Sequence, residues 1–158
     1  MEDHAGIAQL VEMYASMIYR IAYTRMQNVA DAEDITQEVL LKYLKADKTF
    51  REEHRKMWLI RVTVNTIKSN VTSAWRRHTV ALDDVTEPSY EASDLPVLKE
   101  KVEKLPERYR LPMFLYYYEE LSVKEIAHVT KSTEGTVKSL LSRGRKMLRD
   151  ELKEDDYV

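Results

Sequence analysis

The segment that most constrains the fold runs from residue 122 to residue 149 and reads SVKEIAHVTKSTEGTVKSLLSRGRKMLR. Ser122 followed by Glu125 has the spacing of a capping box, which begins a helix. Thr133 can cap a second helix, because its hydroxyl can accept a hydrogen bond from a backbone N–H of the first turn. Apolar residues recur at helical spacing on both sides of this turn. The pattern predicts two amphipathic helices joined by a short turn.

The second of these helices has one apolar side and one polar, basic side. The apolar stripe is predicted to consist of Val137, Leu140, Leu141, Met147 and Leu148. Outside this stripe lie Thr136, Lys138, Ser139, Arg143 and Arg145. In a helix-turn-helix unit the second helix enters the major groove of DNA, where short polar side chains read base edges and basic ones neutralise phosphates. The segment is therefore a candidate DNA-binding unit, although helical bundles that bind nothing contain the same pattern.

Two positions at the predicted turn depart from what such a unit usually carries. Lys131 stands where a glycine often provides the positive φ that the turn requires. Ser132 is polar at a position where a core contact is expected. Both departures count against a standard turn.

Glycine and proline are rare, and their positions favour long helices in the first half of the chain. The 158 residues include three glycines, and the four prolines all lie beyond residue 87. Hydrophobic residues make up 44% of the chain, which is enough for a core. We expect an all-α fold made of two small helical domains, the second of which contains the helix-turn-helix.

Three helices are predicted before the middle of the chain. The first covers residues 5–27, the second begins with Asp31 as its cap and Asp34 at the capping-box position, and the third covers residues 55–77. A polar loop around Phe50, residues 46–54, separates the second helix from the third.

A break and two prolines shape the second half. Residues 79–95 contain proline, serine and acids without a helical period, which predicts a flexible linker. Pro106 is predicted at the first position of a helix that runs to about Tyr118. Pro112 should bend or shorten that helix, because proline lacks a backbone N–H.

The net charge of −2 conceals two basic blocks on either side of an acidic one. Residues 51–80 hold seven Lys and Arg against two Asp and Glu, a balance of +5. Residues 81–98 hold five acids and no Lys or Arg, and residues 122–150 hold seven basic against three acidic residues. This alternation indicates two nucleic-acid contacts joined by an acidic linker, or simply solvated helix faces.

The third predicted helix combines cations with aromatic residues. Arg61, Asn65, Lys68, Arg76 and Arg77 are interleaved with Trp58 and Trp75. This combination suits single-stranded or melted DNA, because a base can stack on a ring while a cation pairs with a phosphate. Trp58 is more simply explained as a core residue, whereas both explanations remain open for Trp75.

Several classes of protein lack support in the sequence. There is no cysteine, and the four histidines are scattered without the spacing of metal ligands. There is no Gly-rich phosphate loop. We therefore expect no enzyme activity, no cofactor, no metal and no small-molecule substrate. No apolar run approaches the length of a membrane span, and the N-terminus lacks an apolar signal core, so we expect a cytoplasmic protein.

Taken together, these segments resemble a bacterial sigma factor of the extracytoplasmic-function (ECF) group. DAEDITQEVLLKYL resembles the family's core-polymerase-binding helix, and MWLIRVTVNTIKSN resembles the segment that opens and reads the −10 promoter element. LPERYRLPMFLYYYEELSVKEIA followed by STEGTVKSLLSRGRKML resembles the −35-binding domain. The resemblance implies an N-terminal sigma domain at residues 1–78, a linker at 79–96 and a C-terminal sigma domain at 97–158. It further implies a protein that binds core RNA polymerase and directs promoter-specific transcription initiation.

The resemblance also implies roles for particular residues. Contact with core polymerase is expected from Asp34, Gln37, Glu38 and Leu41. Contact with the −10 element is expected from Phe50, Arg61, Asn65, Lys68, Trp75, Arg76 and Arg77. Contact with the −35 element is expected from Thr136, Lys138, Ser139, Arg143 and Arg145. The chain departs from the common family pattern in having Ser69 for an Asp, Leu140 for an Arg and Gly144 for an Ala, and the glycine should loosen its helix by about 1 kcal/mol.

The implied partners are macromolecules. They are core RNA polymerase, through its β′ clamp helices and its β subunit, promoter DNA, and an anti-sigma factor, which is often membrane-anchored in this family. An anti-sigma factor would hold the protein inactive by covering its polymerase- and DNA-binding faces.

Two other classes remain open at this point. A conventional helix-turn-helix regulator would bind duplex DNA as a dimer without polymerase. A helical interaction protein with no role in DNA binding would show little salt dependence in any DNA affinity.

Overall fold

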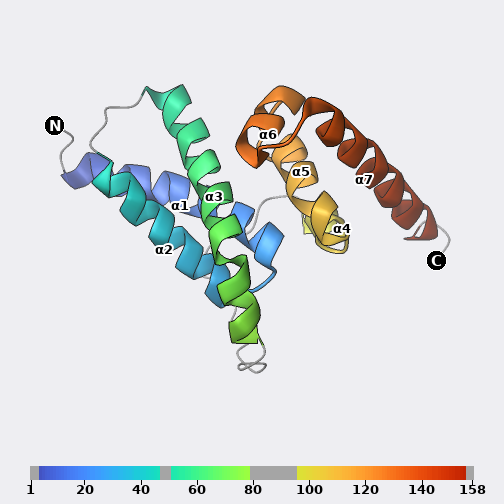
Figure 1. Ribbon diagram of the computed structural model, residues 1–158, viewed down its shortest axis with the longest axis horizontal. Coiled ribbons are helices and arrows are strands. Elements are labelled where there is room, and N and C mark those ends of the chain that lie inside the picture. Colours follow the sequence, from blue (N-terminus) through green and yellow to red (C-terminus); the bar gives the residue numbers. More distant parts are fainter. Residues whose placement is uncertain (1–3, 47–50, 79–95, 156–158) are drawn as a thin grey trace. The chain divides into compact units, whose positions relative to one another are not determined.

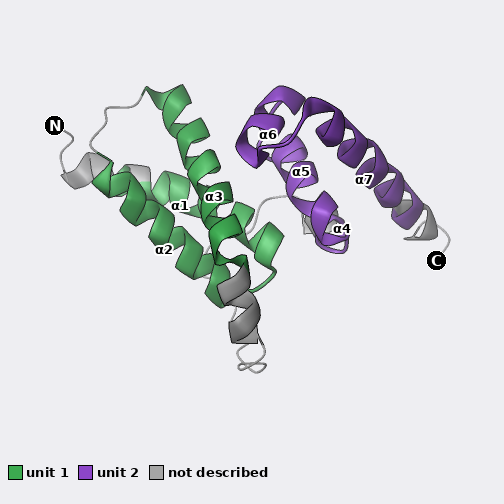
Figure 2. Cartoon of the chain, viewed as in Figure 1, with its two compact units in different colours: residues 1–91 green, residues 92–158 purple. Residues whose placement is uncertain are grey.

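The structure, a computed structural model, describes residues 4–46, 51–78 and 96–155 (Figure 1). Helices are the only regular elements in these ranges, and they confirm the all-α prediction. They are α1 (His4–Met26), α2 (Val29–Lys45), α3 (Glu52–His78), α4 (Pro96–Glu103), α5 (Glu107–Tyr117), α6 (Val123–Thr130) and α7 (Glu134–Asp155). The chain divides into two compact units, residues 1–91 and residues 92–158 (Figure 2). Phe50 and the predicted linker, residues 79–95, lie outside the described residues.

The N-terminal unit packs α1, α2 and α3 around one apolar core. The core side chains come from all three helices and include Ile18, Ile21, Ala22, Ile35, Val39, Leu59, Ile60, Val64 and Ile67. Buried threonine hydroxyls bond to carbonyls one turn earlier: Thr36 donates to Ala32 at 2.7 Å and Thr63 donates to Leu59 at 2.6 Å. These polar groups are therefore satisfied within their own helices, and the core needs no water or partner for them.

The turn between α1 and α2 is shorter than predicted. Gln27 adopts a φ of 53°, which ends α1, and its N–H donates to the Tyr23 carbonyl at 2.8 Å. Asn28 is extended, and its side-chain oxygen accepts from the N–H of Asp31 at 2.9 Å. The prediction that Asp31 caps α2 was wrong, since Asn28 holds that place. Asp31 instead lies buried in the first turn, where the helix dipole favours a carboxylate.

The third helix begins at Glu52, one turn before the predicted start. Glu52 and Glu53 occupy its first turn, where negative charge is favourable, so residues 52–54, predicted as part of a loop, belong to the helix. Within this helix Leu59 and Ile67 are buried, and Trp58 is half-buried with its ring 6.1 Å from that of Tyr43.

The C-terminal unit contains α4 to α7 around a second core. Its fully buried side chains include Tyr109, Met113, Phe114, Leu115, Ile126 and Leu141. Pro106 is the N-cap of α5 rather than its first helical residue. Pro112 lies inside α5 and is buried, and the helix continues past it to Tyr117.

The predicted helix-turn-helix is formed by α6 and α7. Ser122 and Glu125 make the reciprocal capping box, with hydrogen bonds of 2.9 and 3.1 Å. Lys131 takes the left-handed conformation, with φ 56° and ψ 43°, and Ser132 N–H donates back to the Ala127 carbonyl at 3.0 Å. The turn therefore has the geometry usually provided by glycine, and the expectation that Lys131 counts against it was wrong.

Gly144 lies at the contact between α7 and α5. A Cβ at this position would lie 2.8 Å from Met113 Sδ and 2.9 Å from Met113 Cγ. Glycine therefore allows the two helices to approach closely here. The sequence suggested only that Gly144 loosens α7, whereas the structure shows that an alanine has no room unless Met113 moves.

Candidate functional site

One face of α2 combines carboxylates, an amide and exposed leucines. Asp34 and Gln37 are exposed, Glu38 is half-buried, and 55% of Leu41 is exposed to solvent. Residues at these spacings share one side of a helix, while Ile35 and Val39 on the other side are buried. Leu44, on the next turn of α2, is 54% exposed. The structure thus brings together all four residues predicted to bind polymerase, on a surface that can offer both charge and apolar area to a partner helix.

The same face of α2 is connected to α3 by polar side chains. Asn70 Nδ2 donates to Glu38 Oε2 at 3.1 Å and to the Thr66 carbonyl at 2.8 Å. Lys42 Nζ lies 3.5 Å from Glu38 Oε1 and donates to Thr66 Oγ1 at 3.0 Å. Four residues from two helices therefore form a closed ring, which we call the α2–α3 polar ring. Sequence reasoning identified only Glu38 among them.

A polar stripe runs along α3. Arg61 and Lys68 are exposed and Asn65 is half-buried, at spacings of four and three that place them on one side. Buried Ile60, Val64 and Ile67 lie on the neighbouring side, about 100° around the helix, and hold it in the core. The remaining predicted −10 residues of α3, which are Trp75, Arg76 and Arg77, lie in its last turns, where the structure describes the helix but not the side chains.

The predicted DNA-reading face of α7 is exposed along its whole length. Its exposed members are Thr136, Lys138, Ser139, Arg143 and Arg145. Val137 and Leu141, on the other side of the helix, are each 1% exposed and fix α7 in the unit. Thr133 caps α7 by accepting from the N–H of Thr136 at 3.1 Å, and its hydroxyl donates to the Thr136 hydroxyl at 2.9 Å. The Thr136 O–H therefore remains able to donate to a nucleic-acid acceptor.

Arg145 is held by two tyrosines that sequence reasoning missed. Its Nε donates to the Tyr117 hydroxyl at 2.6 Å, and its guanidinium carbon lies 5.4 Å from the centre of the Tyr116 ring. The two rings meet edge to face with their centres 5.0 Å apart. Only Nε is used by Tyr117, so the terminal nitrogens keep N–H groups that can meet a phosphate. The run of three tyrosines in the sequence was the available signal, but nothing local connects it to a residue 28 positions away.

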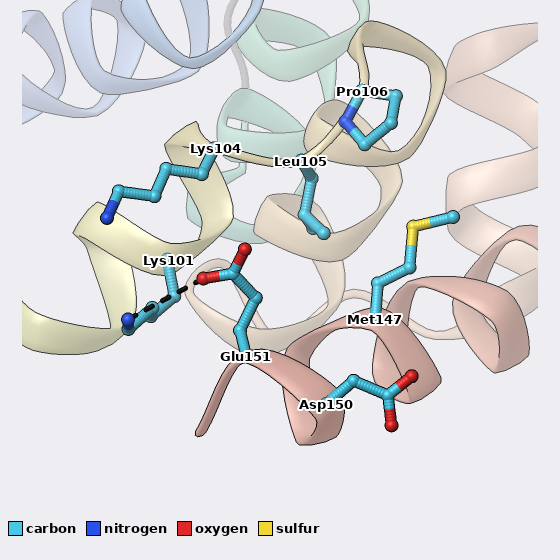
Figure 3. A pocket seen from close by; sticks show the side chains of 7 residues that line it. All are labelled: Lys101, Lys104, Leu105, Pro106, Met147, Asp150 and Glu151. Carbon is cyan, nitrogen blue, oxygen red and sulfur yellow. Dashed lines mark ion pairs between the residues drawn. The ribbon is translucent and has the colours of Figure 1, made fainter. Parts of the chain in front are cut away.

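A hollow of about 260 Å³ lies beside α4 and the end of α7 (Figure 3). Its walls carry two lysines and two carboxylates, and Lys101 Nζ lies 3.6 Å from Glu151 Oε2. The Lys101 side chain is only 8% exposed, so this ion pair compensates for a buried charge and ties α4 to α7. Among the described residues, no three His, Cys, Asp or Glu side chains are grouped to hold a metal ion. The hollow therefore contributes a structural ion pair rather than a recognisable chemical site.

Two family models match this arrangement of helices. Sigma-70 region 2 matches residues 10–77, and Sigma-70, region 4 matches residues 97–148. RNA polymerase sigma factor SigV of Bacillus subtilis (strain 168) is 32% identical over 147 aligned positions, which cover 87% of this chain and 86% of SigV. ECF RNA polymerase sigma factor SigW of the same strain is 28% identical over 171 aligned positions, which cover 96% of this chain and 91% of SigW. This chain belongs to the ECF group of RNA polymerase sigma factors.

The fold of this sigma factor is also that of a solved relative. The sigma factor RpoE from Bartonella quintana, in its co-crystal structure with the anti-sigma factor NepR, matches with a TM-score of 0.69 at 23% identity. The match covers 92% of this chain and 96% of that one.

Membership of the family makes the protein a transcription initiation factor and not an enzyme. The region 2 match contains the α2 and α3 faces, and the region 4 match contains the helix-turn-helix. None of the helices that the structure describes has the length and hydropathy needed to cross a bilayer.

Proposed function

We propose that this sigma factor binds core RNA polymerase through the exposed face of α2. Asp34, Gln37 and Glu38 would pair with basic groups of the β′ clamp helices, and Leu41 would anchor the contact. An apolar side chain surrounded by polar ones is the usual composition of an interface centre and its rim. The exposure of Leu41 supports this role, because the side chain takes no part in the buried core of the N-terminal unit.

The N-terminal domain, residues 1–78, would also open and read the −10 element. The amide of Asn65 can pair with a base edge, while Arg61 and Lys68 can neutralise phosphates. Phe50, Trp75, Arg76 and Arg77 are proposed to complete this surface, the aromatic residues by stacking on unpaired bases.

The C-terminal domain, residues 97–158, would bind the −35 element through α7. Thr136, Lys138 and Ser139 would approach base edges, since recognition helices contact bases mainly through their N-terminal residues. Arg143 and Arg145 would contact phosphates. The single observation that carries the proposal is this face of α7, which is exposed from Thr136 to Arg145 on a capped helix-turn-helix.

Regulation would come from an anti-sigma factor that covers these faces. The anti-sigma factor in the structure of the Bartonella quintana relative supports this proposal. Residues 79–96 would act as the linker that lets the anti-sigma factor hold the two domains and later release them. The sigma factor would be in the cytoplasm, and the anti-sigma factor would be anchored in the membrane.

Run-off transcription with purified core polymerase on genomic fragments tests the proposal. Discrete transcripts should appear only when the sigma factor is added. Leu41→Asp should weaken core binding at least tenfold, a loss typical of an interface hot spot. Met13→Asp is the matched control, because Met13 is a similarly exposed apolar residue, at 59%, on α1 of the same unit.

A second pair of variants tests promoter contact. Arg143→Ala should lower promoter affinity and reduce the salt slope of binding by about one unit, as expected for one lost phosphate contact. Lys104→Ala removes another exposed cation of the same unit, outside α7, and should change neither quantity. Absence of transcripts, together with tight binding of a palindromic duplex by the protein alone, would instead support a conventional dimeric regulator.

A further inference from the structure

The α2–α3 polar ring fixes the orientation of a side chain on the proposed polymerase face. Each carboxylate oxygen of Glu38 has its own partner, because Oε2 accepts from Asn70 and Oε1 faces Lys42. Both partners are themselves held by Thr66, which is fully buried on α3. The position of the Glu38 carboxylate is therefore set by α3 and not by α2 alone.

The ring leaves Glu38 able to bind a partner. Its side chain is 44% exposed, and a carboxylate has about four lone-pair sites, of which the ring uses two. A long glutamate side chain otherwise samples several rotamers, and ordering them on binding weakens the affinity. A carboxylate held in one orientation before the partner arrives avoids much of that loss.

We propose that Asn70 is a positioning residue for core-polymerase binding, holding the Glu38 carboxylate in the orientation that the polymerase recognises. This inference rests on the proposed function of the α2 face. Asn70 is the member of the ring best suited to this role, because its amide donates to the carboxylate and to the Thr66 carbonyl at once. The amide plane is thereby fixed at both of its N–H groups.

The test is a double-mutant cycle on the full-length protein, with affinity for core polymerase as the measurement. Asn70→Ala should weaken core binding about two- to tenfold, the range expected for the loss of one side-chain hydrogen bond. In a Glu38→Ala background the same change should have no further effect. Asn70→Asp preserves the shape of the side chain but places a carboxylate beside Glu38, so it should weaken binding at least as much.

Ser69→Ala is the matched control. Ser69 lies next to Asn70, and its hydroxyl donates to the same Thr66 carbonyl at 3.0 Å without reaching α2. Core affinity should stay within about twofold in this variant, because no residue of α2 loses a hydrogen bond. Thermal unfolding of each free variant shows whether any loss of affinity follows a loss of structure.

Three results would overturn the inference. If Glu38→Ala weakens core binding while Asn70→Ala and Asn70→Asp do not, Asn70 does not position Glu38, and the proposed function is unaffected. If Asn70→Ala weakens binding equally with and without Glu38, it acts through the fold. If neither Glu38→Ala nor Leu41→Asp changes core affinity, the assignment of the α2 face fails and the inference fails with it.

Discussion

Gly144→Ala should destabilise the C-terminal unit, although the same substitution usually strengthens a helix. Alanine is favoured over glycine inside a helix by about 1 kcal/mol. The new Cβ would lie 2.8 Å from Met113 Sδ, well inside the contact distance of about 3.5–4.0 Å for such atoms. Met113 is fully buried, so its movement would disturb neighbouring core side chains, and overpacking of this kind costs about 1–3 kcal/mol. We expect a net destabilisation of about 1 kcal/mol from these two opposing terms.

The sign should reverse when Met113 is shortened. Met113→Ala alone should cost about 2–5 kcal/mol through lost burial and a cavity. In that background the Cβ at position 144 meets no sulfur, so Gly144→Ala should stabilise the unit by about 1 kcal/mol, its helix-propensity gain. The coupling free energy between the two positions would then be about 2 kcal/mol, large for residues in direct contact but within the usual range.

Native-state hydrogen exchange of the α5 and α7 amides measures these changes in the intact protein. Amides of α1 to α3 serve as the internal reference, because they belong to the other compact unit. If Gly144→Ala with Met113 unchanged stabilises the C-terminal unit by the full difference in helix propensity, about 1 kcal/mol, the close approach of α7 to α5 is refuted. Equal destabilisation with and without Met113 would refute the assignment of the clash to that side chain.

Three further predictions follow from local geometry. Lys131→Gly should stabilise the helix-turn-helix by about 0.5–1 kcal/mol, since a left-handed conformation costs a non-glycine residue more than glycine loses in entropy. Lys131→Ala removes the charge but keeps the Cβ, so it should not stabilise the unit. Hydrogen exchange of the α6 amides distinguishes the two variants. Tyr117→Phe should lower the promoter affinity of the holoenzyme about two- to tenfold by releasing Arg145, and an unchanged affinity would exclude Tyr117 from DNA binding. Burial, followed by the nearby Glu103 carboxylate, raises the pKa of Tyr118 above its ordinary value of 10.0. The stability that neutral Tyr118 contributes should therefore be fully present below pH 10.0 and be lost as the pH rises through the folded-state pKa. In urea unfolding over the same pH range, the free energy of unfolding of Tyr118→Phe should decline less than that of the unchanged protein.

The helix-turn-helix was predictable because its signals are local. Ser122 and Glu125 are three positions apart, and the hydrogen bonds that they make cross a single helical turn. Thr133 acts in the same way at the start of α7. Lys131 was misjudged because any L-residue can occupy the left-handed region at a modest energetic cost, and the capped helices on both sides determine the turn.

The start of α2 was predicted wrongly for a different reason. Asn28 and Asp31 are both good capping residues, so composition alone cannot choose between them. The choice depends on where α1 ends, and α1 ends at the positive φ of Gln27, a residue type that gives no such signal. Once Gln27 turns the chain, Asn28 is the extended residue that precedes the new helix.

Contacts between helices account for what the sequence could not show about the candidate site. A helical period indicates which face is buried, but not which residues of two helices lie opposite each other. Asn70 meets Glu38 across 32 positions and Arg145 meets Tyr117 across 28, so each pair depends on how far one helix is shifted along the other. Gly144 illustrates the same limit. Considered within α7 alone, a glycine lowers helix stability, whereas the distance from its Cβ position to Met113 shows that no larger residue fits there unless Met113 moves. The residues predicted from local pattern are therefore those that face the proposed partners, and the residues found only in the structure are those that hold them in place.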